Sequence, residues 1–354
     1  MTSLSNLLGL FLQPFRTLTL PPPTTFTNKT ILITGSNTGI GLAAATHFIR
    51  LNASKVILAV RNPTKGEAAK EKIEAETGRT GVVEVWGLDL ERWESVEGCL
   101  ERVKEMVRGE GGRLDVAVMN AGVAKKGWEV SDGGWECQVQ VNVLSTALLA
   151  RGLLPLMVES SKKIGGAEEE GGWKPHLMIL TSDAHMDCAF EERKLGEKEN
   201  ILSALNDRER WEKASSNPVE RYAVTKLLDI YIGLSLAQLT PNTTTAPDSF
   251  SSPNVIVNLV APGFCKSELL SREEGAPLML RFMQWLTARS TMEGAKTIVD
   301  AAVRGEESHG RYLDHQKVAR MGRLVMSEEG VRVREKVWGE ILEVLEGVVR
   351  EGSV

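Results

Sequence analysis

The sequence predicts an α/β fold in which helices cover both faces of a doubly wound parallel sheet. Short apolar runs alternate with longer helical segments, a glycine-rich turn directly follows the first run, and 354 residues suffice for a large core. Of these residues 42% are hydrophobic and 25% charged, which is typical of a soluble globular protein. Because consecutive strands would be joined through helices, the crossovers are expected to be right-handed and the sheet parallel.

The expected elements follow one another from Thr30 onward. We predict strands over 31–33, 56–60, 82–86, 114–119, 176–180 and 255–260, and helices over 42–51, 66–77, 95–107, 135–157, 222–238 and 331–349. The polar segments 159–172 and 240–253 are predicted to be surface loops, because neither interrupts the alternation. We therefore expect a single domain that comprises an amino-terminal arm and linker (1–29), the main body (30–267) and a helical carboxy-terminal lid and extension (268–354).

Charge and cysteine content exclude several classes of function. The net charge is −5 and the basic residues are scattered, so no nucleic-acid partner is expected. The four cysteines have no metal-ligand or disulfide spacing, so we expect no metal site and a reducing, cytoplasmic location. Segment 4–12 is apolar but too short to span a bilayer. We expect this arm to pack on the domain, with a shallow peripheral membrane contact as the alternative.

A glycine-rich turn lies between the first strand and the first helix. It reads Thr34-Gly-Ser-Asn-Thr-Gly-Ile-Gly41. Glycine permits positive φ and lets backbone N–H groups approach a pyrophosphate, and the following helix points its partly positive end at the same place. A glycine cluster by itself is usually a tight turn, but after the first strand of a βαβ pattern it predicts dinucleotide binding.

The end of the second strand indicates which dinucleotide binds. An acidic residue there would bind a ribose 2′-hydroxyl, whereas an arginine accommodates a 2′-phosphate. The strand ends in Arg61-Asn62, with no acid, which favours NADP(H) over NAD(H) unless the arginine is simply solvated. After the third strand, Asp89 is a candidate acceptor for the adenine amino group, or alternatively a cap for the next helix.

Tyr222 and Lys226 are spaced i, i+4, which places both side chains on one helix face, about 5–6 Å apart at Cβ. A free tyrosine has a pKa of about 10, and lowering it to about 7 takes roughly 4 kcal/mol. An ammonium group about 4 Å away supplies roughly that energy at an effective dielectric near 20, before desolvation costs. The pair could therefore exchange protons at neutral pH, although the spacing alone also occurs by chance on solvated helices.

Taken in order, these pieces resemble the short-chain dehydrogenase/reductase family, which has a Rossmann-type fold, from about Thr30 to at least Ser267. The motifs that carry the resemblance are the glycine turn, Leu88-Asp-Leu90, Asn120-Ala-Gly122, Val141-Asn-Val143, Ser182, the Tyr222/Lys226 pair and Pro262-Gly263. Each motif by itself is weak evidence for the family, but seven motifs in the order of the family are specific evidence for it.

The resemblance implies a catalytic tetrad of Asn142, Ser182, Tyr222 and Lys226. Tyr222 would be the acid/base, Lys226 would lower its pKa and hold the nicotinamide ribose, Ser182 would bond the reacting oxygen, and Asn142 would hold a helix irregularity and a water. Together, the turn, the strand ends and the resemblance predict a set of cofactor-binding residues. These are Gly35, Asn37, Thr38, Gly39, Ile40, Gly41, Arg61, Asp89, Asn120, Ala121, Gly122, Tyr222, Lys226, Pro262, Gly263, Cys265 and Ser267. Cys265 and Ser267 replace the valine and threonine of the family pattern.

The substrate is indicated only loosely. Segment 278–286, within the expected lid, is an apolar stretch. Segments 305–313 and 331–349 look like those of fungal retinol-dehydrogenase-like members, many of which serve secondary metabolism. The resemblance thus implies an apolar ketone or alcohol, and a homodimer formed through helices 135–157 and 222–238. A non-catalytic NADP(H)-binding regulatory or scaffold protein is the alternative. A Ser182–His185 hydrolase lacks the Gly-x-Ser-x-Gly turn such enzymes need.

Overall fold

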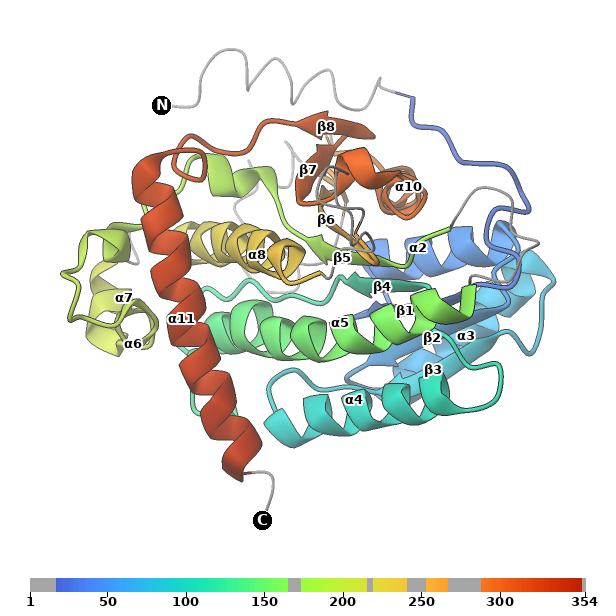
Figure 1. Cartoon of the computed structure of the whole chain (residues 1–354), viewed down its shortest axis with the longest axis horizontal. Coiled ribbons are helices and arrows are strands. Elements are labelled where there is room, and N and C mark those ends of the chain that lie inside the picture. The colour runs from blue at the N-terminus through green and yellow to red at the C-terminus, as the bar shows by residue number, and fades with distance from the viewer. Residues whose placement is uncertain (1–16, 165–172, 215–218, 241–252, 267–287, 352–354) are drawn as a thin grey trace, which may run out of the picture.

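One eight-stranded sheet forms the centre of the fold, with strand order β3-β2-β1-β4-β5-β6-β7-β8 (Figure 1). The computed structural model describes residues 17–164, 173–214, 219–240, 253–266 and 288–351. The strands are β1 (Thr30–Thr34), β2 (Lys55–Val60), β3 (Val83–Gly87), β4 (Val116–Met119), β5 (His176–Leu180), β6 (Ile256–Ala261), β7 (Arg311–Asp314) and β8 (Lys317–Ala319). The first seven pair in parallel, and β8 is antiparallel to β7.

Helices cover both faces of this sheet. The longer ones are α2 (Gly39–Arg50), α3 (Pro63–Thr77), α4 (Trp93–Arg108), α5 (Ser145–Ile164), α8 (Glu220–Gln238), α10 (Thr291–Ala301) and α11 (Glu328–Glu351). Residues of α4, α5, α8 and α11 share one apolar core with one face of the sheet, and residues of α2, α3 and α10 share the other. Since central strands such as β1 are buried on both faces, they are continuously apolar rather than alternating.

The strand order places the carboxyl ends of β1 and β4 side by side at the point where the chain changes direction across the sheet. The chain moves outward from β1 through β2 to β3, then returns to β4 on the other side of β1. In open parallel sheets, ligands bind outside the carboxyl ends of the strands at such a point. The glycine turn and Asn120 both lie there, directly after β1 and β4.

The predicted fold class is confirmed, with differences at particular elements. The helix expected over 135–157 begins as a π-helix, η2 (Val139–Leu144), and α5 continues to Ile164, so residues 159–164, expected to be loop, are helical. Tertiary contacts extend this helix: the Ser160 hydroxyl accepts a hydrogen bond from Leu114 N at 2.9 Å. The region expected as a helical extension also contributes β7 and β8 to the sheet.

The described residues between β5 and α8 form four short helices that the sequence patterns did not predict. They are the 3₁₀ helices η3 (Asp183–Met186) and η4 (Glu191–Lys194) and the α-helices α6 (Ile201–Leu205) and α7 (Arg208–Ala214). Each is too short to show a helical period in the sequence. The carboxy-terminal helix α11 packs against α6 and α8, where Figure 1 shows it crossing the end of the molecule.

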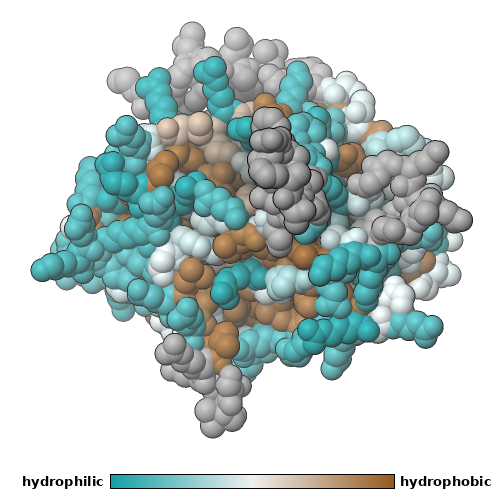
Figure 2. Space-filling view, in the orientation of Figure 1, coloured by the Kyte–Doolittle hydropathy of each residue, from teal (hydrophilic) through white to brown (hydrophobic). Residues whose placement is uncertain are grey.

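The amino-terminal segment is anchored on the domain from residue 18. Leu18 N donates to Glu293 on α10 at 2.9 Å, and Lys296 donates back to Leu18 O at 2.9 Å. Segment 4–12 lies outside the described residues. Among the described residues one helical segment, Val139–Lys163, is long and apolar enough to cross a membrane, but 78% of its apolar window is buried inside the protein. Figure 2 shows apolar side chains gathered where α5 runs, within a mostly hydrophilic face.

The contact between α11 and α6 gives a stability prediction. Buried Glu340 on α11 accepts hydrogen bonds from the amides of Ile201 and Leu202 at 3.0 and 2.9 Å. Glu340→Ala should lower the free energy of unfolding by about 2 kcal/mol, because two buried amides lose a charged acceptor. Urea unfolding measures this. Glu343→Ala, at an exposed position of the same helix, should change it by less than about 0.5 kcal/mol, and equal losses would contradict the assignment.

Candidate active site

The glycine turn after β1 brings bare backbone to the end of the sheet. Gly35 and Gly39 have φ of +64° and +62°, the left-handed region in which other residues are strained. At Gly41 a Cβ would lie 2.5 Å from Asn120 Nδ2 and 2.7 Å from Gly35 O, so no side chain fits there. Thr38 begins α2 without capping it through its side chain. The turn therefore leaves room for a pyrophosphate at the amino end of α2, which fits a dinucleotide.

Asn120 holds this turn in place. Its Nδ2 donates to Thr34 O at 2.7 Å and to Gly35 O at 3.1 Å, while the backbone amides of Asn120 and Ala121 donate to the Thr34 hydroxyl at 3.0 and 2.9 Å. These bonds join the carboxyl ends of β1 and β4. The structure thus places the predicted residues Asn120 and Ala121 at the turn. The side-chain amide of Asn120 donates its hydrogen bonds to backbone carbonyls of that turn.

Arg61 lies at the carboxyl end of β2, as predicted, but its guanidinium is already paired. Arg61 Nη1 lies 2.7 Å from Glu91 Oε1, and the arginine side chain is 66% exposed. Asp89, after β3, accepts a hydrogen bond from Glu91 N at 3.1 Å and does not cap α4, whose N-cap is Arg92. The Arg61–Glu91 pair is the part of the predicted ribose site that the sequence reasoning did not foresee.

Two lysines of α3 face the glycine turn across a hollow. The hollow is lined by Asn37, Thr38, Gly39, Leu42, Lys65, Ala68, Ala69 and Lys72. Predicted residues Asn37, Thr38 and Gly39 form one wall, while Ile40 is partly buried against the core. The side chain of Asn62 caps α3 by accepting from Lys65 N at 3.0 Å, which fixes the start of this helix beside Arg61. The hollow is thus positively charged on its α3 side.

Asn142 lies in the π-helix η2, which agrees with the helix irregularity expected at this position. Its Oδ1 accepts from Val123 N at 2.8 Å, and its Nδ2 donates to Val123 O at 2.9 Å and to the Thr225 hydroxyl at 3.0 Å. Thr225 in turn donates to Tyr222 O at 2.8 Å. Asn142 therefore connects the end of β4 to the helix turn that carries Tyr222.

The loop after β5 carries Ser182 and is fixed by the carboxy-terminal region. His185 Nδ1 donates to Ser182 O at 2.6 Å, because its Nε2 accepts from Gly322 N at 3.0 Å and the neutral ring has one proton. Next to Ser182, Asp183 accepts from the Tyr312 hydroxyl of β7. Since His185 contacts the backbone oxygen of Ser182 and not its hydroxyl, this is not the nucleophile–base pair of a hydrolase.

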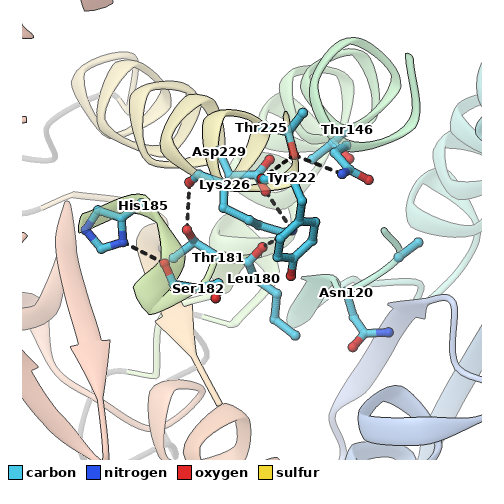
Figure 3. A network of polar contacts seen from close by, with 12 residues as sticks. Asn120, Thr146, Leu180, Thr181, Ser182, His185, Tyr222, Thr225, Lys226 and Asp229 are labelled. Atoms are coloured by element: carbon cyan, nitrogen blue, oxygen red, sulfur yellow. Dashed lines mark hydrogen bonds and ion pairs between the residues drawn. The ribbon is translucent and has the colours of Figure 1, made fainter. Parts of the chain in front are cut away.

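Tyr222, Lys226 and Asp229 project from α8 toward the carboxyl end of β5 (Figure 3). Lys226 Nζ donates to Leu180 O at 2.9 Å and to Asp229 Oδ2 at 2.8 Å, and it lies 5.7 Å from the Tyr222 ring centroid. Both charged side chains are nearly inaccessible, at 7% and 2% exposure. The structure therefore brings the predicted tyrosine, lysine and Ser182 together and adds a buried carboxylate.

Burial controls the protonation of this cluster. It raises the pKa of Tyr222 above its usual value, Lys226 and a hydrogen bond with Ser182 lower it, and Asp229 raises it. Burial lowers the pKa of Lys226, but Asp229 and Tyr222 raise it, so the net shift is upward. Lys226 thus acts on Tyr222 in the predicted direction. The predicted net lowering of the Tyr222 pKa was wrong, because burial and Asp229 outweigh the ammonium.

Ser182, and not the adjacent Thr181, faces the tyrosine. The Ser182 side chain lowers the pKa of Tyr222, whereas buried Thr181 donates to Lys226 O at 2.7 Å. This division follows from the alternation of side chains along an extended strand. Gly122 lies on the opposite side, where a Cβ would be 3.6 Å from Lys226 Nζ. The absence of a side chain at Gly122 thus leaves space directly in front of the ammonium.

The segment after β6 follows its predicted course only in part. Gly263 has φ of +76°, so it turns the chain at the strand end. Cys265 is buried, and a Cβ on Gly294 of α10 would lie 2.3 Å from its Sγ. The thiol of Cys265 therefore packs against α10, and only its backbone is available to a ligand. Ser267 and the apolar stretch 278–286 lie outside the described residues. In the described part of the chain no three His, Cys, Asp or Glu side chains could hold a metal ion.

Asp229 and Thr225 contact the predicted tetrad and were missed by the sequence reasoning. Asp229 lies three residues after Lys226, and a charge pair at i, i+3 on the helix is a signal that the sequence contained. That spacing is common on solvated helices. It became informative only once the structure showed that both side chains are buried.

Known proteins resemble this chain in sequence over most of its length. A family model described as short chain dehydrogenase matches residues 29–166. A short-chain dehydrogenase of Penicillium roqueforti is 37% identical over 357 aligned residues, which cover 98% of this chain and 84% of the relative. A short chain dehydrogenase/reductase of a Cryptosporiopsis species is 33% identical, with 96% of this chain and 97% of the relative covered.

Solved structures share the fold at lower identity. A protein from Mycobacterium paratuberculosis has a TM-score of 0.61 at 21% identity, covering 93% of this chain and 98% of its own. A short chain dehydrogenase from Escherichia coli, complexed with NADPH, has a TM-score of 0.54 at 22% identity, covering 84% of this chain and 100% of its own. These likenesses show the fold.

The close approach at Gly41 gives a prediction for ligand binding. Gly41→Ala should weaken NADPH binding by roughly tenfold, about 1.4 kcal/mol, because the added methyl group displaces Asn120 or the Gly35 carbonyl. Quenching of protein fluorescence by NADPH measures this. Gly98→Ala, where a Cβ on α4 meets nothing within 4 Å, should leave binding unchanged and stabilise the protein by about 0.5–1 kcal/mol. Unchanged binding in the first variant would contradict the assignment.

Proposed function

The chain belongs to the short-chain dehydrogenase/reductase family, and on this premise we propose that it is an NADP(H)-dependent oxidoreductase. It would interconvert a ketone or aldehyde and an alcohol on an apolar small molecule. The observation that carries this proposal is the convergence of Tyr222, Lys226 and Ser182 at the carboxyl end of β5. A second supporting observation is the glycine turn, whose bare backbone lies at the amino end of α2.

Each residue of the site has a separate task in the reaction. The nicotinamide cofactor, when bound, supplies or accepts the hydride. In the reducing direction, Tyr222 donates its phenolic proton to the carbonyl oxygen, and in the oxidising direction it accepts the hydroxyl proton. Ser182 presents a hydroxyl to the same oxygen and stabilises the charge that develops there. Lys226, fixed by Leu180 O and Asp229, stabilises the phenolate that remains.

The preference for NADP(H) rests on the positive charges around the ribose site. Arg61 stands at the end of β2, and Lys65 and Lys72 line the hollow beside the glycine turn. The Arg61–Glu91 pair is largely exposed, and such pairs contribute about 0–1 kcal/mol. A doubly charged phosphate can therefore displace the glutamate. Solved relatives of this fold are described as complexed with NADP or NADPH, which agrees with this choice.

An apolar substrate is supported by two exposed apolar side chains that are close in sequence to Ser182 and Tyr222. Met186, in the loop that carries Ser182, is 39% exposed, and Val219, three residues before Tyr222, is 49% exposed. Large apolar side chains left open beside polar catalytic groups suit a substrate with an apolar body. Participation in secondary metabolism is part of the same proposal and rests on resemblance to fungal members of the family.

A homodimer and a cytoplasmic location, with or without a peripheral membrane contact, also remain proposals. The helices expected to pair are α5 and α8.

The role of Tyr222 can be tested against a matched tyrosine on the same helix. Tyr222→Phe should lower kcat for an apolar ketone such as cyclohexanone by roughly 10²–10⁴-fold, because the proton donor is lost. Tyr231→Phe should retain activity, because the buried Tyr231 hydroxyl bonds with no described residue. NADPH oxidation is followed at 340 nm over a panel of ketones. NADPH binding without any turnover would instead favour the regulatory or scaffold alternative.

The choice of cofactor can be tested with two variants of opposite effect. Arg61→Ala should raise KM for NADPH by roughly tenfold and leave KM for NADH unchanged, since charge-assisted hydrogen bonds contribute about 1.5–3 kcal/mol. Glu91→Gln should lower KM for NADPH a few-fold, roughly the value of the exposed pair it removes. Equal changes in KM for NADPH and for NADH would show that Arg61 does not bind the 2′-phosphate.

A further inference from the structure

A buried carboxylate lies against the lysine of the site. Asp229 is 1% exposed, and its Oδ2 lies 2.8 Å from Lys226 Nζ. Its second oxygen, Oδ1, accepts no hydrogen bond from any described residue. Burying a carboxylate is costly, and leaving one oxygen unsatisfied adds to the cost. A carboxylate retained only to stabilise the fold would be expected to use both oxygens, as Asp115 does with Arg113 and Thr30.

Asp229 also fixes where the lysine points. Two of the three Nζ protons of Lys226 go to Asp229 and Leu180 O. The ammonium lies beside Gly122, whose missing side chain opens the space toward the cofactor side. With two partners held in place by α8 and β5, one proton of the ammonium is left for a further acceptor. The geometry suits a lysine that is positioned before the ligand arrives.

The carboxylate acts on Tyr222 in the opposite sense to the lysine. Burial makes the largest contribution to the raised pKa of Tyr222, and Asp229 adds to it, while Lys226 lowers it. Burial also raises the pKa of Asp229, to about 6, which leaves it ionised at neutral pH. Tyr222 therefore faces an ion pair of near-zero net charge and not an isolated cation.

No other described charge faces this pair. The segments η2 and β6 carry no charged side chain, and β5 carries only His176, at its opposite end. On η3, Asp183 bonds with the hydroxyl of Tyr312, and neutral His185 bonds with backbone groups. The charges of α11 that act on α8, Glu329 and Arg334, do so at Tyr231, two turns from the catalytic tyrosine.

We propose that Asp229 is a positioning residue of this site. Its carboxylate fixes the Lys226 ammonium and offsets its charge, so that Tyr222 stays protonated at neutral pH and the site is set for carbonyl reduction. This inference rests on the proposed function, because it assigns the direction in which the same tyrosine works. A protonated tyrosine is the form that donates to a carbonyl oxygen, whereas alcohol oxidation needs the phenolate.

The protonation of Tyr222 can be followed without turnover. The chain has three tyrosines, so protein labelled with ¹³C at tyrosine Cζ gives three resonances, and Tyr222→Phe identifies one. Burial raises the pKa of all three tyrosines, so the Tyr222→Phe spectrum is needed to assign the Tyr222 signal. In wild-type protein saturated with NADPH, the Tyr222 signal should be that of a phenol at pH 7. A phenolate signal at pH 7 would overturn the proposal.

Removing the carboxylate should make Tyr222 a stronger acid. In Asp229→Asn, the midpoint of the Tyr222 titration should fall by about one pH unit, because a negative charge leaves the coupled cluster. Asp229→Glu should restore it in part. Asp229→Ser, which leaves room for a water beside Lys226, replaces the asparagine variant if that fails to fold. An unchanged midpoint in the neutral variant would overturn the proposal.

A matched control separates this effect from general destabilisation. Asp115→Asn removes another buried carboxylate, paired with Arg113 at the start of β4. It should lower stability and leave the Tyr222 midpoint unchanged. An equal shift in both variants would overturn the proposal. Failure to reduce any ketone would refute the proposed function and leave these titrations as an independent result.

Discussion

The attachment of α8 to the end of β5 is the constraint on which the site depends. Two bonds make it: Thr181 donates to Lys226 O, and Lys226 Nζ donates to Leu180 O. A third bond, from Asn142 of η2 to Thr225, fixes the same helix from another side. They set the rotation of α8 about its axis. Without them, a helix with an apolar face could pack on the sheet in several rotations, and Tyr222 and Ser182 would meet in only one of them.

The carboxy-terminal third of the chain supports this arrangement from outside the nucleotide-binding core. Tyr312 of β7 and Gly322 bond with Asp183 and His185, which flank the turn after Ser182. Glu340 of α11 binds the start of α6, within the segment that leads to α8. The loop that carries the serine is therefore held by strands and helices added at the end of the sheet, and changes there are expected to reach the site through these bonds.

Burial decides the electrostatics of the site. Spacing alone predicted that Lys226 would lower the pKa of Tyr222, and its charge does act in that direction. The low-dielectric surroundings and the nearby carboxylate act more strongly the other way. The result is a tyrosine whose pKa is raised by neighbours that have no common sequence motif.

The sequence by itself determined the fold class and the places of β1 to β6 along the chain, because apolar periodicity and glycine turns are local properties. It placed Tyr222 and Lys226 on one helix face and, through the resemblance, Ser182 at a strand end, and the structure brings these three residues together. It did not predict the short helices after β5, because they are too short to show a helical period of apolar residues. It also did not predict the Arg61–Glu91 pair, which joins the segments after two different strands. The role of Asp229 also required the tertiary structure, because only packing removes the pair from water and turns a common i, i+3 spacing into a buried charge beside Tyr222.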